Sequence, residues 1–381
     1  MNIVHLELAG FYNENTSYQT NCLAACNLAD GHTVTVISSP FHWVGAQLVY
    51  TPPCDQVVEG GVRLIRLAYQ NASKRYSTQK IRAVIGLYEA LASLRPDIIF
   101  CHCVQFLSVL DVIRYKKDHP QVKLYADTHT AAYNSGTNWL SLHVLHRIFY
   151  RYLVRQTLPY LEKFFYVGIG EKEFAMANYG VPETLMEFYP LGGTLLSDAE
   201  YSAVRARRRA ELGLEENDRL YIHSGKLEAP KRTDELLRAF SAVGDPHAVL
   251  AVIGSIPEDR KSVLLPLIEA DSRIRYLGWK TGEELQEYLC AADLYCQPGS
   301  VSATMQNAIC RNTPIMSYPH LAYTAALDYG QFFWVRNQAD MEQIFTKIKA
   351  DPAVLIPRAA AARRCAEELL DYRTLAARLY R

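Results

Sequence analysis

The sequence of 381 residues lacks a charge excess of either sign, because Lys and Arg together number 40 and Asp and Glu also number 40. Strong non-specific binding to nucleic acid usually requires a basic excess or a dense basic stripe. The one short basic run contains Arg205, Arg207, Arg208 and Arg209, and we interpret it as the solvated face of a polar helix. The composition therefore argues against a nucleic-acid partner.

The nine cysteines are scattered and form no pair of Cys-x-x-Cys units. Structural zinc sites usually show such paired spacing. Acidic pairs placed to hold a metal ion are also missing beside the motifs at the strand ends. We therefore expect no metal and no cofactor, and we interpret the cysteines as reduced core thiols of a cytosolic protein.

Long apolar runs are absent as well, since no stretch reaches the length of about 18 residues that a membrane-spanning helix needs. The N-terminus begins directly with a strand-like stretch, so we expect no signal peptide. These features predict a cytoplasmic protein. Segment 138–158 has an apolar face edged by Arg147, Arg151 and Arg155. Packing on a sheet explains this face best, and peripheral contact with an anionic inner membrane surface is the alternative.

Short apolar runs alternate with longer helical patterns along the chain. Strands are expected at 2–8, 33–38, 62–67, 97–101, 122–127, 163–167, 219–224, 248–253, 273–277, 293–296 and 313–317. Helices are expected at 16–30, 79–94, 104–117, 138–158, 171–179, 232–243, 258–269, 282–291, 302–311 and 337–349. Such alternation predicts parallel sheets with right-handed crossovers. Two successive sets predict an α/β protein with two Rossmann-like, doubly wound domains.

The alternation breaks near 190–200, where Pro190–Gly193 interrupts the pattern. We expect an N-terminal domain at 1–195 and a C-terminal domain at 196–356. The segment 357–381 is expected to be a helix that packs back toward the N-terminal domain. Ligands bind outside the carboxyl ends of strands in open parallel sheets, so we expect the site in a cleft between two facing domains.

The strongest motif surrounds Gly225, where a strand ends and a helix begins at about Thr233. The loop between them carries Lys226 and Lys231. It can wrap an anion and bring both ammonium groups to one diphosphate. A departing nucleoside diphosphate gains charge in the transition state, so fixed cations there speed its departure. The alternative is a pair of solvated lysines.

The second motif lies where a strand runs into Pro298 and then into a short polar stretch before a helix. Free amides at a helix N-terminus, with serine hydroxyls beside them, form an anion site. Two amide side chains about one to two turns further on could reach ribose hydroxyls, although an ordinary capped helix would look similar. The candidate donor-binding residues here are Gly299, Ser300, Val301, Ser302, Gln306 and Asn307.

These two motifs, in this order and spacing, resemble family 4 of the retaining glycosyltransferases, and the resemblance covers nearly the whole chain. The family's motifs correspond to Gly225-Lys226…Lys231, Pro298…Asn307-Ala308 and Asn312-Thr313-Pro314. The resemblance implies the B-type fold of two facing Rossmann-like domains. It also implies that Gly254 and Ser255 form a second nucleotide loop, and that Gly278 and Trp279 belong to a segment that contacts the base.

The implied activity is transfer of a sugar from a UDP- or GDP-sugar to a hydroxyl of a glycan or lipid-linked glycan, with retention and without a metal. By analogy, the implied pathway is bacterial surface polysaccharide biosynthesis. One departure is clear. The family usually carries two Glu eight positions apart, and Gly299 and Asn307 occupy those positions here. The segment resembles a Pro-Gly-x-x-Ser version found in some members.

In the N-terminal half, the resemblance implies that His129 lies near the reacting sugar and positions the donor or acceptor. It also implies that the loop containing Gly10 lies near the donor diphosphate. The acceptor-side candidates are Tyr12, Tyr18, Gln19, His102 and Thr130. Structural alternatives are a strand-end histidine and a helix capped by Thr16 or Ser17.

Two other functions stay open. A sugar-nucleotide epimerase of similar shape would use acidic and histidine side chains around the donor, and carboxylates are scarce in the second-domain motifs. A non-catalytic partner subunit would explain the missing Glu pair, whereas the two lysines and His129 argue against it.

Overall fold

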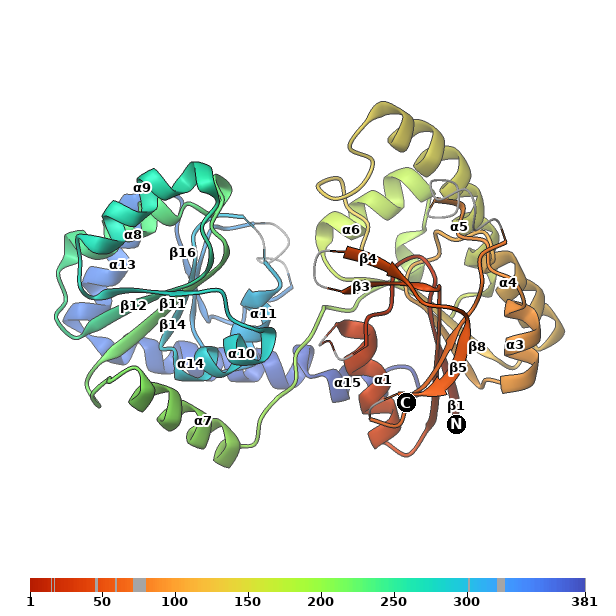
Figure 1. Cartoon of the computed structure of the whole chain (residues 1–381), viewed down its shortest axis with the longest axis horizontal. Helices are drawn as coiled ribbons and strands as arrows, with labels where there is room; N and C mark the ends of the chain where they lie inside the picture. Colours follow the sequence, from red (N-terminus) through yellow and green to blue (C-terminus); the bar gives the residue numbers. More distant parts are fainter. Residues whose placement is uncertain are drawn as a thin grey trace. The chain divides into compact units, whose positions relative to one another are not determined.

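The computed structural model describes residues 1–380 except 15, 17, 45, 46, 59, 71–79, 301 and 321–325. Two compact units make up the chain (Figure 1). The N-terminal unit comprises Met1–Pro190 and Leu375–Arg381, and the C-terminal unit comprises Leu191–Thr374. Each unit has its own parallel sheet and its own core.

The N-terminal unit is built on a sheet of strand order β10-β9-β8-β7-β1-β2-β6-β5, in which every pair is parallel except β5 with β6. A separate antiparallel hairpin pairs β3 with β4. The strands are β1 (Asn2–Glu7), β2 (Thr33–Ser38), β3 (Phe41–Val44), β4 (Gln47–Tyr50), β5 (Cys54–Val57), β6 (Arg63–Arg66), β7 (Ile98–Cys101), β8 (Lys123–Thr128), β9 (Lys163–Tyr166) and β10 (Met186–Phe188). The helices are α1 (Gln19–Ala29), α3 (Leu87–Leu94), α4 (Val109–Asp118), η1 (Ser141–Tyr150), α5 (Arg151–Thr157), η2 (Leu158–Tyr160), α6 (Ile169–Phe174), η3 (Ala175–Tyr179) and η4 (Glu183–Leu185).

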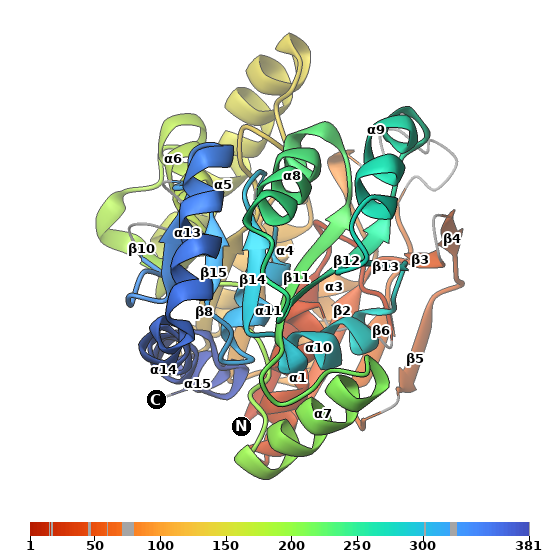
Figure 2. The same ribbon diagram turned by 90° about the vertical axis from the view of Figure 1, so that its left-hand side faces the viewer.

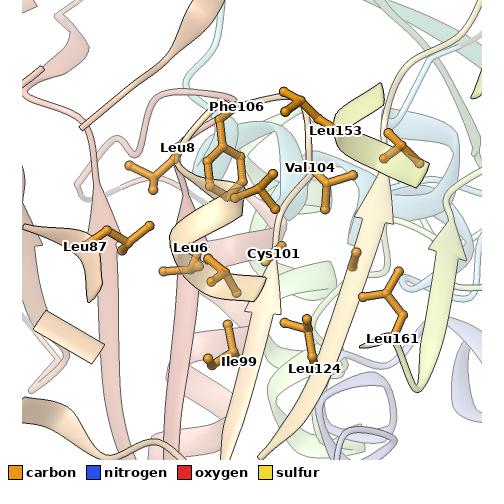
Figure 3. Close-up of a cluster of buried hydrophobic side chains, with 14 of the residues drawn as sticks. Leu6, Leu8, Leu87, Ile99, Cys101, Val104, Phe106, Leu124, Leu153 and Leu161 are labelled. Atoms are coloured by element: carbon orange, nitrogen blue, oxygen red, sulfur yellow. The ribbon is translucent and has the colours of Figure 1, made fainter. Parts of the chain in front are cut away.

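The core of this unit forms where apolar strand residues meet helices (Figure 3). Leu6 of β1, Ile99 of β7 and Leu124 of β8 are fully buried in one cluster, in which Ile99 lies beside its register partner Leu124 and Leu153 comes from α5. Burial of each such side chain contributes about 1.5–3 kcal/mol. The three central strands are therefore fixed, and so are the loops that follow them.

The C-terminal unit has a wholly parallel sheet of strand order β13-β12-β11-β14-β15-β16. The strands are β11 (Arg219–Lys226), β12 (Ala248–Ser255), β13 (Ile274–Gly278), β14 (Leu294–Gln297), β15 (Ile315–Ser317) and β16 (Phe332–Trp334). The helices are α7 (Asp198–Glu211), η5 (Ala229–Lys231), α8 (Thr233–Val243), α9 (Glu258–Glu269), α10 (Gly282–Ala291), α11 (Thr304–Ile309), α13 (Gln338–Ala350), η6 (Pro352–Val354), α14 (Leu355–Cys365) and η7 (Ala366–Leu370). α15 (Tyr372–Ala377) crosses the boundary between the units.

Every strand predicted from the sequence has a counterpart in the two sheets. The prediction missed β3, β4, β5, β10 and β16. These strands have only three or four residues each, and most expose part of their side chains, so they lack the apolar run that marks a buried strand.

The arginine run at 205–209 corrects one interpretation, because it is not simply a solvated face. Arg205 donates to the carbonyls of Cys290, Ala291 and Ala292 at the end of α10, and its guanidinium pairs with Asp293. Arg208 pairs with Glu287. The run therefore fastens α7 to α10, and it satisfies carbonyls that a helix C-terminus leaves without partners.

The C-terminal segment also differs from the single helix that was expected. α14 continues into η7, and the chain then turns at Asp371, which bridges to Gly193. Residues up to Thr374 belong to the C-terminal unit. Beyond them, the carboxylate of Glu187 accepts from Arg378, and Leu375 accepts a 2.8 Å hydrogen bond from the Tyr189 hydroxyl.

Candidate functional site

The ends of β11 and β12 approach each other more closely than side chains would allow. Gly225 and Gly254 are register partners, with φ values of 130° and 138° that favour glycine. A Cβ atom on Gly254 would lie 1.8 Å from the carbonyl oxygen of Gly225. The next residue pair, Lys226 and Ser255, ends the two strands directly after this compact double-glycine edge.

Lys231 lies over this edge. A Cβ atom on Gly225 would be 3.3 Å from Cε and 3.6 Å from Nζ of Lys231. The lysine is half-buried, and burial lowers the pKa of its ammonium group, while the charge of Glu228 acts in the opposite direction. A partly desolvated ammonium group is a stronger partner for an anion than a fully hydrated one.

Lys226 is more open, with 65% of its side chain exposed. Its Nζ lies 2.6 Å from Oε1 of Glu228, and this hydrogen bond raises the pKa of Lys226. An exposed ion pair is weak, so a diphosphate could draw the ammonium group away from the carboxylate.

The loop that carries Lys226 and Lys231 contacts the loop that carries Gly299 and Ser300. The backbone N–H of Ser300 donates to the carbonyl of Pro230 at 2.8 Å. A Cβ atom on Gly299 would lie 2.1 Å from that same carbonyl oxygen. Arg232 adds a second link by donating to the carbonyl of Pro298 at 3.2 Å. The structure thus brings Gly299 and Ser300 directly against the loop that carries Lys231.

The residues after Ser300 lead into the short helix α11. The hydroxyl of Ser302 accepts from the backbone N–H of Thr304 at 3.3 Å, while the N-cap residue of α11 is Ala303, which makes no side-chain cap hydrogen bond. That helix has six residues rather than the ten expected, so its dipole is small. Val301 lies outside the described residues.

Gln306 and Asn307, the candidate ribose ligands, lie on α11. Gln306 is buried, and its Oε1 has no hydrogen-bond partner within the described part of the chain. Asn307 is half-buried, with its Oδ1 3.6 Å from where a Cβ atom on Gly193 would stand. The structure places both toward the interior of the unit.

The candidate base-contact segment ends the neighbouring strand β13. Trp279 is 72% exposed there and follows Gly278, whose φ is 67°. The hydroxyl of Tyr276 donates to the carbonyl of Gly254 at 2.9 Å. This hydrogen bond ties the end of β13 to the double-glycine edge, so four strand ends of the C-terminal unit carry the candidate donor residues.

In the N-terminal unit, a buried chain of polar side chains crosses β1, β7 and β8. His5 Nε2 lies 2.9 Å from Asn27 Oδ1, and His5 Nδ1 lies 3.0 Å from His102 Nε2. His102 Nδ1 lies 3.1 Å from Oδ2 of Asp127, and His129 Nε2 lies 3.4 Å from the same oxygen. Asp127 also accepts from the backbone N–H of Cys103 at 2.8 Å.

Asp127 is the charged centre of this chain. Burial alone would raise its pKa, but His129 and His102 outweigh burial and hold the pKa well below its usual range. Burial works against the charged form of His129 too, and Asp127 more than compensates, so the pKa of His129 is raised. His5 is fully buried beside His102, which lowers its pKa to about 3.

Of these groups, His129 reaches the surface, with 38% of its side chain exposed. Because an ionised carboxylate only accepts hydrogen bonds, His129 presents its Nε2–H to Asp127. His102 was predicted to contact the acceptor, but its side chain is buried within this row of polar groups, where it pairs with Asp127.

The remaining predicted residues of this unit are scattered. A Cβ atom on Gly10 would meet Oε1 of Glu7 at 2.4 Å. Tyr12 is buried, and Gln19 is buried and donates to the carbonyl of Pro190 at 3.0 Å. Tyr18 is exposed. Among the acceptor candidates, Thr130 lines a cavity of about 830 Å³ in this unit.

Sequence reasoning missed the groups that organise this region. Asp127 stands at the end of the expected strand 122–127, two positions before His129, and was not proposed as a site residue, while His5 lies in the middle of an apolar strand without a motif. Glu7 ends β1, accepts from the hydroxyl of Thr20 at 2.6 Å, and has a pKa raised by burial. A polar residue at the carboxyl end of each central strand was the available signal.

Within the part of the chain that the structure describes, no group of three or more His, Cys, Asp and Glu side chains is placed to hold a metal ion. No helix among the described residues has both the length and the apolar character to cross a membrane.

Part of the second half of the chain is similar to a known protein family. Residues 204–350 match the family model of glycosyl transferases group 1. No curated protein sequence matches the chain.

Solved structures share the fold of the entire chain. The structure of Anabaena HepE in complex with UDP has a TM-score of 0.66 and 12% identity, covering 99% of this chain and 98% of that one. WaaG, a glycosyltransferase involved in lipopolysaccharide biosynthesis, has a TM-score of 0.63 and 14% identity, covering 99% of both chains. Sucrose-phosphate synthase from Thermosynechococcus elongatus has a TM-score of 0.64 and 15% identity, covering 99% of this chain and 96% of that one. The predicted fold of two Rossmann-like domains is confirmed, while membership of the retaining family 4 stays a prediction.

Proposed function

The chain carries a glycosyl transferases group 1 domain at residues 204–350 and is a glycosyltransferase, and from this premise we propose its reaction. It moves a sugar from a UDP- or GDP-activated donor to a hydroxyl of a glycan, free or lipid-linked, with retention of configuration. The observation that supports this proposal best is the contact between the Lys231 loop and the Gly299–Ser300 loop at adjacent strand ends. That contact forms a cationic edge for a diphosphate.

The chemistry assigned to this edge is stabilisation of the leaving group. The bond from the anomeric carbon to the diphosphate oxygen breaks, and a bond to the acceptor oxygen forms. The acceptor proton passes to the departing phosphate oxygen, and no protein nucleophile is needed. Lys226 and Lys231 stabilise the charge that grows on the diphosphate, and no metal is invoked. His129 positions the reacting sugar from the N-terminal unit.

Replacement of either lysine tests this assignment. Lys231→Ala and Lys226→Ala are each expected to lower kcat by about a hundredfold or more, because a charge contact made in the transition state is lost. The control is Lys347→Ala, an exposed lysine of α13 that should leave kcat unchanged. Turnover near the wild-type value in both site variants would remove the lysines from the mechanism.

A thermal-shift screen against UDP, GDP, ADP and CMP sugars tests the donor class. A ligand that binds the native state raises the melting temperature, and a UDP- or GDP-sugar is expected to raise it most. UDP is the first choice, because HepE has been solved with UDP and with UDP-glucose. WaaG, which is involved in lipopolysaccharide biosynthesis, supports the assignment of this chain to bacterial surface glycan synthesis.

Product analysis separates the other candidate functions. A transferase releases a nucleoside diphosphate, whereas an epimerase yields an isomer with the mass of the donor. A non-catalytic partner subunit would neither transfer the sugar nor hydrolyse the donor slowly when no acceptor is present.

A further inference from the structure

The helical segment η1–α5 of the N-terminal unit has two apolar faces. Its inner face packs into the core through Tyr150, Leu153 and Val154. This agrees with the packing on a sheet that the sequence predicted for segment 138–158. Its outer face also carries large apolar side chains, and these are exposed to solvent. The segment is the yellow helix that runs along one edge of the unit in Figures 1 and 2. The exposed residues of the outer face, including the turn before η1, are Trp139, Leu140, Val144, Ile148 and Tyr152.

The spacing of these residues makes a continuous stripe. Leu140, Val144, Ile148 and Tyr152 follow one another at four-residue intervals through η1, which is a π-helix, and into α5. All four are exposed, so they lie on the solvent side of the segment. Trp139 is 71% exposed and Ile148 is 64% exposed. Contiguous apolar patches of this kind usually mark a contact with a partner or a membrane.

The charge around the stripe has one sign. Residues 128–161 contain no Asp or Glu, whereas Arg147, Arg151 and Arg155 each stand three residues after a member of the stripe. Arg147 and Arg151 donate hydrogen bonds to Asn178 of η3, and Arg155 is exposed. An apolar helix face flanked by arginine is complementary to an anionic lipid surface. The lack of acidic side chains removes the repulsion that such a surface would otherwise meet.

The cavity of about 830 Å³ lies beside the stripe, because Leu140 and Val144 line it as well. Two cations, Lys80 and Arg82, also line the cavity, and the described lining residues include no Asp or Glu. Arg82 donates to the carbonyl of Gln105 at 2.9 Å, which holds its guanidinium group at the wall. The cavity therefore joins a cationic wall to an apolar mouth.

The buried ring of His146 also lines this cavity. Burial is the main cause that lowers the pKa of His146 to about 4, and the positive charges of Lys80 and Arg82 act in the same direction. The two fixed cations on the wall are the groups that favour an anion. The cavity volume is within the usual range of about 300–1,000 Å³ for sites that take small molecules.

Resting on the proposed transfer reaction, we propose that this cavity takes the phosphate end of an anionic, lipid-linked acceptor. The phosphate lies against Lys80 and Arg82, and the hydrocarbon chain leaves past Leu140 and Val144. The outer stripe and its arginines dock on the anionic membrane that carries the lipid. The acceptor is thus an anionic amphiphile, and Thr130 faces its hydroxyl-bearing part.

Vesicle binding tests the docking surface. The full chain should cosediment with vesicles of phosphatidylcholine and phosphatidylglycerol, and less with phosphatidylcholine alone. Trp139→Ser/Ile148→Ser should reduce vesicle partitioning by about tenfold or more, because two large apolar side chains no longer enter the lipid. Ile356→Ser is the matched control, since Ile356 is 69% exposed but lies on α14 of the C-terminal unit. Equal binding by all variants, or a concentration-dependent dimer that the double substitution abolishes in place of vesicle binding, would overturn the docking surface.

Calorimetric titration with dodecyl phosphate below its micelle concentration tests the cavity. It should bind at least about tenfold more tightly than inorganic phosphate or dodecyl maltoside, which lack the tail or the charge. Val144→Trp should abolish this preference by filling the cavity mouth. The proposal would be overturned if dodecyl maltoside bound as tightly as dodecyl phosphate, or if Val144→Trp left the affinity for dodecyl phosphate unchanged. The UDP thermal shift is measured on the same variants, so loss of that shift would count against the donor site instead.

Discussion

At the residue scale, Asp127 is the group that raises the pKa of His129. It lies buried between His102 and His129 and carries a charge that burial alone would remove. Its lowered pKa means that it contributes stability above its unfolded pKa of about 3.9, and this contribution is lost as the pH falls through the folded pKa. The raised pKa of His129 contributes stability below about 6.5, and this is lost as the pH rises through the folded pKa.

Asp127→Asn is therefore expected to move the limb of the pH profile of kcat/KM that reports His129 to lower pH. The physical reason is that the amide no longer favours the protonated ring, so His129 loses its proton at a lower pH. Asp55→Asn, at an exposed ion pair of the same unit, should leave the limb in place. A profile that keeps its position in Asp127→Asn would show that His129 does not titrate in the reaction.

At the element scale, glycine decides how the loops of the C-terminal unit meet. The family's first Glu position is Gly299 here, and the structure gives a reason for the difference. A side chain at Gly299 would overlap the carbonyl of Pro230, which also accepts the hydrogen bond of Ser300. A carboxylate cannot be restored at this position while the two loops keep their contact.

Gly299→Ala is expected to destabilise the C-terminal unit by about 1–3 kcal/mol, because the added methyl group forces the backbone of Pro230 and Lys231 to shift. Thermal or urea unfolding measures this loss. The control is Gly282→Ala at the start of α10, where a methyl group meets nothing within 4 Å among the described residues. Equal stability of the two variants would contradict the tight contact.

At the scale of the whole molecule, the sequence predicted the architecture well. The alternation of apolar runs with helical patterns gave both parallel sheets, because strand burial and right-handed crossovers depend on local pattern. The sequence pattern did not predict the short strands β3, β4, β5, β10 and β16, because their pairing depends on neighbours that lie elsewhere in the chain.

The candidate site divides along the same line. Lys226 and Lys231 followed from the sequence alone, because a strand, a glycine and two cations stand within one loop. The tertiary structure decided that Ser300 bonds to that loop, that His102 is buried behind Asp127, and that the segment after His129 has a second, exposed apolar face. Each of these depends on contacts between residues far apart in the chain, and a linear pattern carries no signal for them.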